Sequence, residues 1–218
     1  MVRSRPKIIL SAAMTIDGKI ASKSGDSKLS SKKDKIRVHK LRSKTDAILI
    51  GKNTLLRDDP LLTVRYHKGK NPIRIILDSK GEIPPNSKII KTCKKIPTII
   101  AVSQNISQKN LNRLKKLPLQ IIFAGTKRIS IQKLLKILFK QKIQTILLEG
   151  GSKTNWEFIS KGFVDEIIIT IAPIVVGGQT STSLVGGEGF LNMQKSKKFK
   201  LKNISKFKNE FVVHYSKL

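Results

Sequence analysis

The stretch Gln144–Ile159 reads QTILLEGGSKTNWEFI, and its order of residue types decides the fold class. The run TILL is short and mostly apolar, which is typical of a buried strand. Glu149 ends this run, and Gly150 and Gly151 come directly after it, before a polar segment that opens a helix. The stretch therefore predicts a strand, a glycine turn and a helix, with a carboxylate at the carboxyl end of the strand.

The same alternation of strand and helix continues along the chain. Short apolar runs predict strands at residues 7–14, 47–51, 73–78, 98–102, 120–125 and 166–178. Capped or amphipathic segments predict helices at residues 30–44, 107–117, 130–142 and 155–162. Ser31 and Asp34 form the N-cap signature of the first helix. Two segments with period-two alternation, 199–207 and 210–218, predict a C-terminal antiparallel hairpin. This repetition favours an α/β fold with a mostly parallel sheet flanked by helices.

Length and cysteine content favour one domain in a reducing compartment. The chain has 218 residues, which suits one domain or at most two small ones. Cys93 is the only cysteine, which rules out an internal disulfide and a multi-cysteine zinc site, so we expect a cytoplasmic protein. The N-terminal sequence MVRSRPKIILSAAM mimics a signal peptide, but its apolar run is too short, and no stretch approaches the length of a membrane span.

The net charge of +30 would suit nucleic acid or an acidic membrane. The lysines are spread along the whole chain, however, as on a surface that follows the composition of the source genome. RNA-binding surfaces usually interleave aromatic residues for stacking, and this chain has two Tyr and one Trp. We therefore expect a phosphorylated small ligand, and neither nucleic acid nor membrane, as the partner.

Polar residues follow several of the predicted strands. In open parallel sheets, ligands bind beyond the carboxyl ends of the strands. Gly150 and Gly151 would let backbone amides approach a phosphate beside the positive end of the next helix. A purely structural glycine turn explains this sequence about as well. Other polar strand ends lie at residues 14–19, 51–59, 78–80 and 125–126, and together they would line one edge of the sheet.

The common catalytic motifs are absent from the sequence. No G-x-G-x-x-G opens a helix, and neither a phosphate-binding G-x-x-x-x-G-K-[ST] nor a G-x-S-x-G elbow occurs. His39, His67 and His214 are scattered without metal-ligand spacing, and His39 is expected at the surface of a helix. No metal site is predicted. The pattern favours chemistry that depends on a bound organic cofactor.

Five segments occur in an order that resembles one family. They are MTIDGKIA, GKNTLLRDDPLLTVR, IRIILDS, LLEGGSKTNW and VDEIIITIAPIVVGG. Over roughly residues 7–216, the chain resembles the reductase of riboflavin biosynthesis, both its stand-alone archaeal and fungal form and the C-terminal half of the bacterial deaminase–reductase. The zinc-deaminase signatures H-x-E and P-C-x-x-C are absent, so only the reductase half is present.

The resemblance implies a dihydrofolate-reductase-like fold, a single reductase domain over residues 1–218 and a homodimer. The implied cofactor is NADPH, and the implied substrate is a pyrimidinone with a ribosylamino 5′-phosphate. Its sugar opens to an imine, and hydride transfer to C1′ gives the ribitylamino product. The lack of a fused deaminase favours the 2,5-diamino form of the pyrimidinone. The alternative is an NADPH-dependent reductase of another pterin or pyrimidine, although the carboxylate and tryptophan motif of dihydrofolate reductase cannot be placed here.

The resemblance also implies roles for individual residues. Lys19 and Glu149 match the positions closest to the reacting sugar, where a proton must be managed. The implied cofactor contacts are Ala13, Leu29, Thr54, Asp58, Ser79, Lys80, Gly125, Gly150, Gly151 and Ser152. The implied substrate contacts are Ser27, Arg42, Leu62 and Arg65, of which the arginines suit a phosphate. Ser152 departs from the family, which often has a third glycine there.

Simpler structural roles stay open for several of these residues. Asp58 would also serve as a turn or cap residue before Pro60, and Arg42 as a solvated charge on a helix. Asp17 precedes a glycine, so a turn role is favoured over catalysis. Lys19 and Glu149 would also serve as an ion pair that only fixes the glycine turn.

Overall fold

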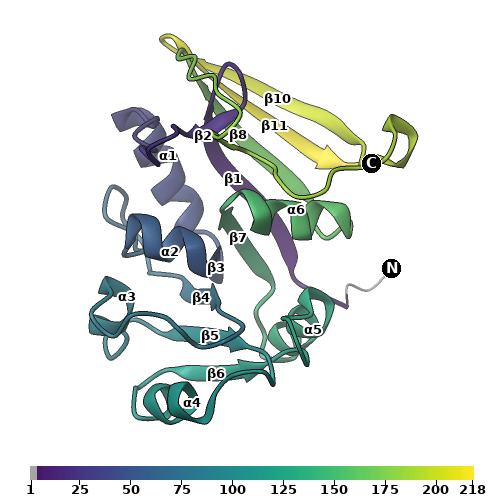
Figure 1. Cartoon of the computed structure of the whole chain (residues 1–218). Helices are drawn as coiled ribbons and strands as arrows, with labels where there is room; N and C mark the ends of the chain where they lie inside the picture. Colours follow the sequence, from purple (N-terminus) through teal and green to yellow (C-terminus); the bar gives the residue numbers. More distant parts are fainter. Residues whose placement is uncertain (1–3) are drawn as a thin grey trace. The chain divides into compact units, whose positions relative to one another are not determined.

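The computed structural model describes residues 4–218 (Figure 1). These residues form two compact units, each assembled from two separate stretches of the chain. We call residues 4–7 and 40–147 the β3–β6 unit, and residues 8–39 and 148–218 the hairpin unit. Each unit is described by itself.

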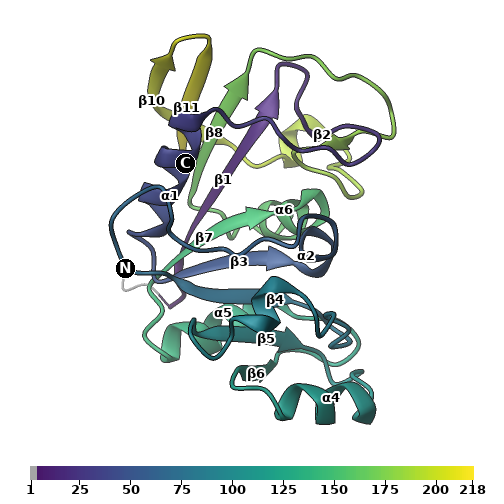
Figure 2. The same ribbon diagram turned by 90° about the vertical axis from the view of Figure 1, so that its left-hand side faces the viewer.

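The β3–β6 unit contains four parallel strands in chain order. They are β3 (Ala47–Gly51), β4 (Ile73–Leu77), β5 (Thr98–Val102) and β6 (Gln120–Phe123). Each strand pairs in parallel with the next, and Figure 2 shows the four running side by side. The predicted bounds of β3 and β5 are confirmed to the residue, because both strands are fully buried apolar runs.

The helices of this unit follow its strands. They are α2 (Lys52–Asp58), α3 (Lys88–Lys91), α4 (Gln108–Lys115) and α5 (Ile131–Lys140). Ser107 and Ser130 cap α4 and α5 by accepting a hydrogen bond from the third backbone amide that follows each serine. Leu134, Leu135 and Leu138 of α5 are buried as predicted, and each contributes roughly 1.5–3 kcal/mol of hydrophobic stabilisation.

Arg74 is a buried cation in the middle of this unit. Its side chain is fully buried on β4, where the guanidinium donates to the hydroxyls of Thr98 and Thr92, both at 2.7 Å. It also donates to the carbonyls of Ile89 and Ile96, at 3.0 and 3.2 Å. Burial lowers the pKa of Arg74 to about 10, so the group is still charged at neutral pH. A further bond to the Leu61 carbonyl at 3.4 Å means that Arg74 ties together segments that precede β4 and β5.

The hairpin unit combines parallel and antiparallel pairing. β1 (Lys7–Thr15) pairs in parallel with β8 (Glu166–Ala172), and β8 pairs antiparallel with β11 (Glu210–Lys217). β10 (Phe199–Phe207) completes the predicted hairpin beside β11, as both views show (Figures 1 and 2). A second small sheet pairs β2 (Lys19–Ala21) with β9 (Thr182–Ser183).

The remaining elements are α1 (Lys32–Arg42), β7 (Thr145–Gly150), α6 (Ser152–Ser160) and the short 3₁₀ helix η1 (Met193–Lys195). The predicted cap of α1 is confirmed, because the Ser31 hydroxyl accepts from the Asp34 amide at 3.2 Å. His39 of α1 is 4% exposed, so its expected surface position was wrong. The buried residues of this helix are the polar Asp34, His39 and Arg42, whereas Ile36 is 40% exposed, so apolar periodicity does not determine which side of the helix is buried.

Other differences from the sequence prediction have local causes. The strand predicted over residues 166–178 ends at Ala172, because Pro173 has no N–H to continue the ladder. α6 begins at Ser152, three residues before the predicted start, and α2 occupies a segment expected as a loop. The predicted fold class is confirmed: an α/β fold with mostly parallel strands flanked by helices, and an antiparallel hairpin. Within residues 4–218, no helix is long and apolar enough to cross a membrane.

Candidate active site

The glycine turn after β7 has the backbone geometry that the sequence analysis expected. Glu149 lies at the penultimate position of β7 and is half-buried. Gly150 and Gly151 have φ angles of 45° and 105°, in the region that favours glycine. Gly151 is the N-cap of α6 and supplies no side-chain cap, so the first turn of α6, which begins at Ser152, presents backbone N–H groups at its end. These groups fit an anionic ligand.

Asp17 organises the turn that precedes Lys19. Its carboxylate accepts hydrogen bonds from the Thr15 hydroxyl at 2.6 Å and from the amides of Gly177 and Val176 at 2.8 and 3.2 Å. The Thr15 bond, with these two amides, lowers the pKa of Asp17 to about 2. The Thr15 hydroxyl also accepts from the Lys19 amide at 2.9 Å. Asp17 therefore has the turn role that the sequence favoured, and the backbone of Lys19 is held at the start of β2.

The other predicted residues of the hairpin unit lie on β1 and in the segment after β2. Ala13 is half-buried on β1, in register with Thr170 of β8. Ser27 is exposed, and its carbonyl accepts from the Leu29 amide at 2.8 Å. Leu29 is half-buried two residues before the cap of α1. Ser27 and Leu29 therefore share one tight turn.

Thr54 and Asp58 lie on α2, not in a loop. Thr54 is half-buried in the first turn, and Asp58 is the last residue of the helix. The Asp58 carboxylate accepts from Arg57 Nε at 2.9 Å. The residue that caps this helix end is Asp59, with φ of 37°. The two predicted cofactor contacts are thus four positions apart, which places them on one side of the helix.

Arg42 and Arg65 both bond to Thr63. Arg42 is 8% exposed and donates to the Thr63 carbonyl at 2.9 Å, so its alternative role as a solvated charge was wrong. Arg65 donates to the Thr63 hydroxyl at 2.7 Å. Leu62 is 2% exposed and packs in the core of the β3–β6 unit, with a left-handed φ of 53°. Any contact of Leu62 with a substrate would therefore use its backbone.

Ser79 follows β4 and is fixed by its neighbours. Its carbonyl accepts both the amide and the hydroxyl of Ser103, at 3.0 and 2.9 Å. The preceding residue, Asp78, is buried and accepts from the Ile83 amide at 2.7 Å. Burial nevertheless raises the pKa of Asp78. The side chain of Lys80 is exposed, so this turn presents a cation next to the hydrogen-bonded Ser79.

Gly125 follows β6 in a conformation that only glycine tolerates. Its φ is 131°, and a Cβ there would lie 2.1 Å from the Arg128 carbonyl oxygen. The Gly125 carbonyl accepts from the Gln104 amide at 2.9 Å. These contacts give Gly125 a structural role whether or not a cofactor approaches it.

The structure places the predicted residues in both units. The hairpin unit holds Ala13, Lys19, Ser27, Leu29, Glu149, Gly150, Gly151 and Ser152. The β3–β6 unit holds Arg42, Thr54, Asp58, Leu62, Arg65, Ser79, Lys80 and Gly125. Within the units, Arg42 and Arg65 meet at one threonine, and Lys19 follows the Asp17 turn. Their roles in binding and catalysis stay predictions.

Sequence reasoning missed two residues that organise these sites. Thr63 is 7% exposed and orients both arginines, and Asn155 is buried in the first turn of α6. Thr63 could have been noticed in the sequence, because it is a polar residue between Leu62 and Val64 in an otherwise apolar stretch. Asn155 offered none, because helices often carry asparagine on a solvated face.

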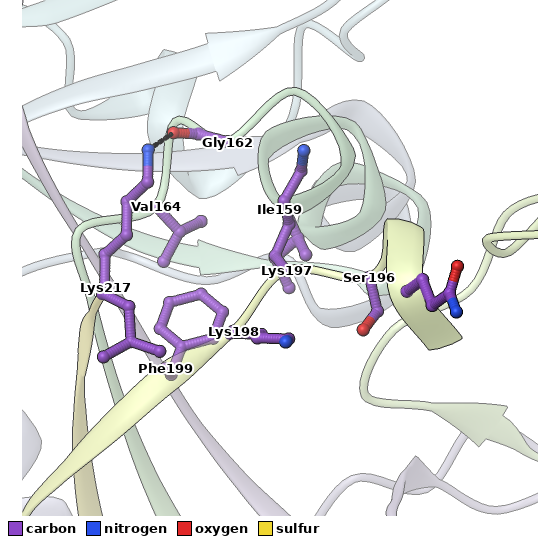
Figure 3. A pocket seen from close by; sticks show the side chains of 10 residues that line it. Ile159, Gly162, Val164, Ser196, Lys197, Lys198, Phe199 and Lys217 are labelled. Atoms are coloured by element: carbon purple, nitrogen blue, oxygen red, sulfur yellow. Dashed lines mark hydrogen bonds between the residues drawn. The ribbon is translucent and has the colours of Figure 1, made fainter. Parts of the chain in front are cut away.

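A cavity of about 250 Å³ in the hairpin unit lies apart from the predicted residues (Figure 3). Its apolar floor includes Ile159, Val164 and Phe199, and Lys197 and Lys217 stand at its sides. The Lys217 ammonium donates to the Gly162 carbonyl at 2.8 Å. The cavity borders the C-terminal end of α6, whereas the glycine turn lies at the N-terminal end. None of the predicted site residues lines it.

No group of three or more His, Cys, Asp or Glu side chains within residues 4–218 is arranged to hold a metal ion. The donors described above are backbone amides, hydroxyls, arginines and lysines, a set that suits phosphates.

Comparison with known proteins identifies relatives over the whole chain. The 2,5-diamino-6-ribosylamino-4(3H)-pyrimidinone 5′-phosphate reductase of Methanothermobacter thermautotrophicus is 39% identical over 215 residues, which cover 97% of this chain and 98% of the relative. The Aquifex aeolicus protein of the same name is 38% identical, over 87% of each chain. The riboflavin biosynthesis protein RibD of Actinobacillus pleuropneumoniae is 34% identical, and this chain spans 57% of its length.

Solved structures share the fold. The deaminase/reductase of Thermotoga maritima matches 98% of this chain and 57% of its own, with a TM-score of 0.81 and 28% identity. The Saccharomyces cerevisiae riboflavin biosynthesis reductase Rib7 matches the whole chain with a TM-score of 0.75, and its 22% identity supports the fold alone. The family model described as the RibD C-terminal domain matches residues 6–213. This chain therefore belongs to the RibD C-terminal domain family.

Proposed function

We propose that this chain is an NADPH-dependent reductase of riboflavin biosynthesis. Its substrate would be 2,5-diamino-6-ribosylamino-4(3H)-pyrimidinone 5′-phosphate, whose ribosylamino group is reduced to the ribitylamino form. The observation that carries the proposal is the end-to-end match, at 39% identity, with a stand-alone relative that bears the name of this reductase. Relatives of the deaminase–reductase type match over only about half of their length, as for the Actinobacillus protein at 57%.

The residues fit a pyridine-nucleotide cofactor. The turn at Gly150 and Gly151 offers amides at a helix end, which suits a pyrophosphate, and Thr54 offers a hydroxyl. When bound, the cofactor supplies the hydride for C1′ of the opened sugar. The preference for NADPH over NADH is supported by the exposed cation Lys80, next to Ser79 in the turn after β4, since a cation suits the 2′-phosphate.

The chain's own residues would bind the phosphate and move the proton. Arg42 and Arg65 hold the substrate phosphate, with Thr63 setting their direction. Ring opening requires a proton on the sugar oxygen, which Lys19 donates. Glu149 orients a sugar hydroxyl and stabilises the positive charge that develops at the imine nitrogen. The contacts of Ala13, Ser27 and Leu29 would follow the family pattern.

A direct assay tests the proposed function. The purified chain is incubated with NADPH and either the diamino pyrimidinone or its deaminated counterpart, and the products are weighed by mass spectrometry. We expect the diamino substrate to gain two hydrogens, with one NADPH oxidised per product. Absence of turnover on both pyrimidines would contradict the proposal. Equal kcat/KM with NADH and NADPH would contradict the cofactor preference alone.

Substitution on α2 tests the cofactor contact. Thr54→Ala combined with Asp58→Ala should raise the Kd for NADPH about tenfold or more, since each lost bond to a ligand is worth roughly 1 kcal/mol. Calorimetric titration measures this Kd. Asn53→Ala is the matched control, because Asn53 is an exposed neighbour on the same helix and should leave the Kd unchanged. An unaltered Kd in the double variant would remove α2 from the cofactor site.

We also propose that the chain forms a homodimer in the cytoplasm. Leu201, Ile204 and Phe211 are 48%, 54% and 44% exposed. The hairpin register places them on one face with Tyr215, because a bulge between Leu201 and Asn203 brings Leu201 and Ile204 to the same side. An exposed apolar sheet face of this kind supports association of two copies.

A further inference from the structure

Asn155 is a buried amide in the first turn of α6 that reaches two other segments of the hairpin unit. It is 2% exposed, and its backbone N–H donates to the Gly151 carbonyl at 2.9 Å. Its side-chain Nδ2 donates to the Leu184 carbonyl at 2.8 Å. Its Oδ1 lies against Gly150, where an added Cβ would be only 1.8 Å away. Asn155 therefore touches the glycine turn on one side and the segment after β9 on the other.

The peptide groups of Leu184 continue this connection to the strand that carries Lys19. The Leu184 N–H donates to the Gly18 carbonyl at 2.9 Å, while the Leu184 carbonyl accepts from Asn155. The preceding residue, Ser183 of β9, is the register partner of Lys19 on β2. A short, continuous path of hydrogen bonds thus runs from the glycine turn to the backbone of Lys19.

Two glycines seat the same segment directly on α6. The Gly186 amide donates to the Ser152 carbonyl at 3.2 Å, and a Cβ at Gly186 would lie 2.6 Å from the Ser152 hydroxyl oxygen. A Cβ at Gly187 would lie 2.1 Å from Cδ1 of Trp156. The segment 184–187 is therefore in close contact with the N-terminal part of the helix.

The two polar atoms of the Asn155 side chain have opposite effects on stability: Nδ2 satisfies the Leu184 carbonyl, whereas Oδ1 is a cost. Its Oδ1 is buried and has no hydrogen-bond partner among the residues that the structure describes. A buried acceptor without a partner is unfavourable, and leucine has nearly the same shape without that defect. An amide at this position therefore points to a need for the Nδ2 bond to Leu184.

We infer that Asn155 is a positioning residue that couples the glycine turn to Lys19. The inference rests on the proposed function, in which the turn holds the cofactor and Lys19 donates a proton. By holding the Leu184 peptide, Asn155 fixes the position of β9 relative to the glycine turn. Because β9 pairs with β2, it also fixes the position of β2. Its loss should shift Lys19 relative to the bound cofactor and so slow turnover without unfolding the protein.

Asn155→Leu separates positioning from stability. We expect kcat to fall about tenfold or more and the KM for NADPH to rise, while the melting temperature changes little, because the lost donor to the Leu184 carbonyl is offset by removal of the unpartnered Oδ1. Asn192→Ala is the matched control: Asn192 is exposed in the same unit and caps η1 by accepting from the Lys195 amide at 3.1 Å, so its loss should leave kcat and KM unchanged. Unaltered kcat and KM in Asn155→Leu would overturn the inference.

Asn155→Asp gives an independent readout through its pH profile. An ionised carboxylate cannot donate to the Leu184 carbonyl, but a protonated one can. The activity of Asn155→Asp relative to the wild type should therefore recover as the pH falls, and a flat ratio would overturn the inference. The pH profile of Asn155→Asp still tests the inference if Asn155→Leu fails to fold.

Trp156 provides a test that does not depend on the reaction. It is the only tryptophan in the chain and contacts Gly187, so its quenching by acrylamide reports how firmly segment 184–187 is seated. Both Asn155 variants should be quenched more than the wild type, and unchanged quenching would contradict the coupling. An inactive wild type would defeat the proposed function alone, because the quenching result would still decide whether Asn155 seats this segment.

Discussion

Lys19→Met and Glu149→Gln should each lower kcat by roughly 100-fold or more, because in the proposed function each residue acts on the opening sugar. The affinity for NADPH and the melting temperature should change little. The structure holds the Lys19 backbone through the Thr15 hydroxyl and the pairing of β2 with β9, so the methionine variant keeps its local fold. Stopped-flow or steady-state NADPH oxidation measures kcat, and calorimetry measures the affinity.

The competing explanation is an ion pair that only fixes the glycine turn. Lys23→Met and Glu157→Gln are matched controls, since both residues are exposed in the same unit and Glu157 pairs with Lys161 on the surface. Turnover within a few-fold of wild type in Lys19→Met or Glu149→Gln, or a loss confined to stability, would show that the pair is structural.

Arg65→Ala should weaken binding of the phosphorylated substrate roughly 10- to 100-fold, the range expected for a lost charge-assisted hydrogen bond. The dephosphorylated analogue should lose far less. Arg65 is exposed and bonds to the Thr63 hydroxyl, so its removal leaves the core intact. Arg42→Ala should show the same selectivity together with lower stability, because it leaves the Thr63 carbonyl without its 2.9 Å donor.

The ratio of KM values for the phosphorylated and dephosphorylated substrates is the quantity to measure. Lys68→Ala controls for general loss of positive charge, because Lys68 is an exposed cation three residues after Arg65. It should lower affinity slightly, and less so at high salt. Equal losses for both substrates in Arg65→Ala would show that this arginine does not hold the phosphate.

The strands were largely predictable, because strands in a parallel sheet are continuous apolar runs. β3 and β5 fall at the predicted residues for this reason. The helix α2 was not predictable, because Leu55 is the one buried residue among its seven and the helix shows no apolar periodicity. β2 and β9 could not be predicted from the sequence either, because strands of two or three residues are too short to show an alternation of apolar and polar residues.

The site was predictable only where local sequence determines it. The positive φ of Gly150 and Gly151 follows from their residue type and their place after a strand. The bond from Asn155 to Leu184 spans 29 residues, and that from Arg42 to Thr63 spans 21, so both depend on tertiary packing that no local pattern encodes. The family resemblance named most candidate residues, but it did not name the acceptors Leu184 and Thr63.

The hydrogen bonds of Arg74 bear on how the composition of this chain should be interpreted. Only nine of its 44 basic residues are arginine, so the bias toward lysine is strong. Lysine has three donors on one nitrogen, whereas the planar fork of arginine has five that point in fixed directions. Arg74 uses that fork on five separate acceptor residues, and Arg113 donates to the carbonyls of Ile83 and Gly81 in the same way. In a chain so biased toward lysine, an arginine therefore marks a position where several acceptors must be satisfied at once, and the remaining arginines are the first positions to examine for such contacts.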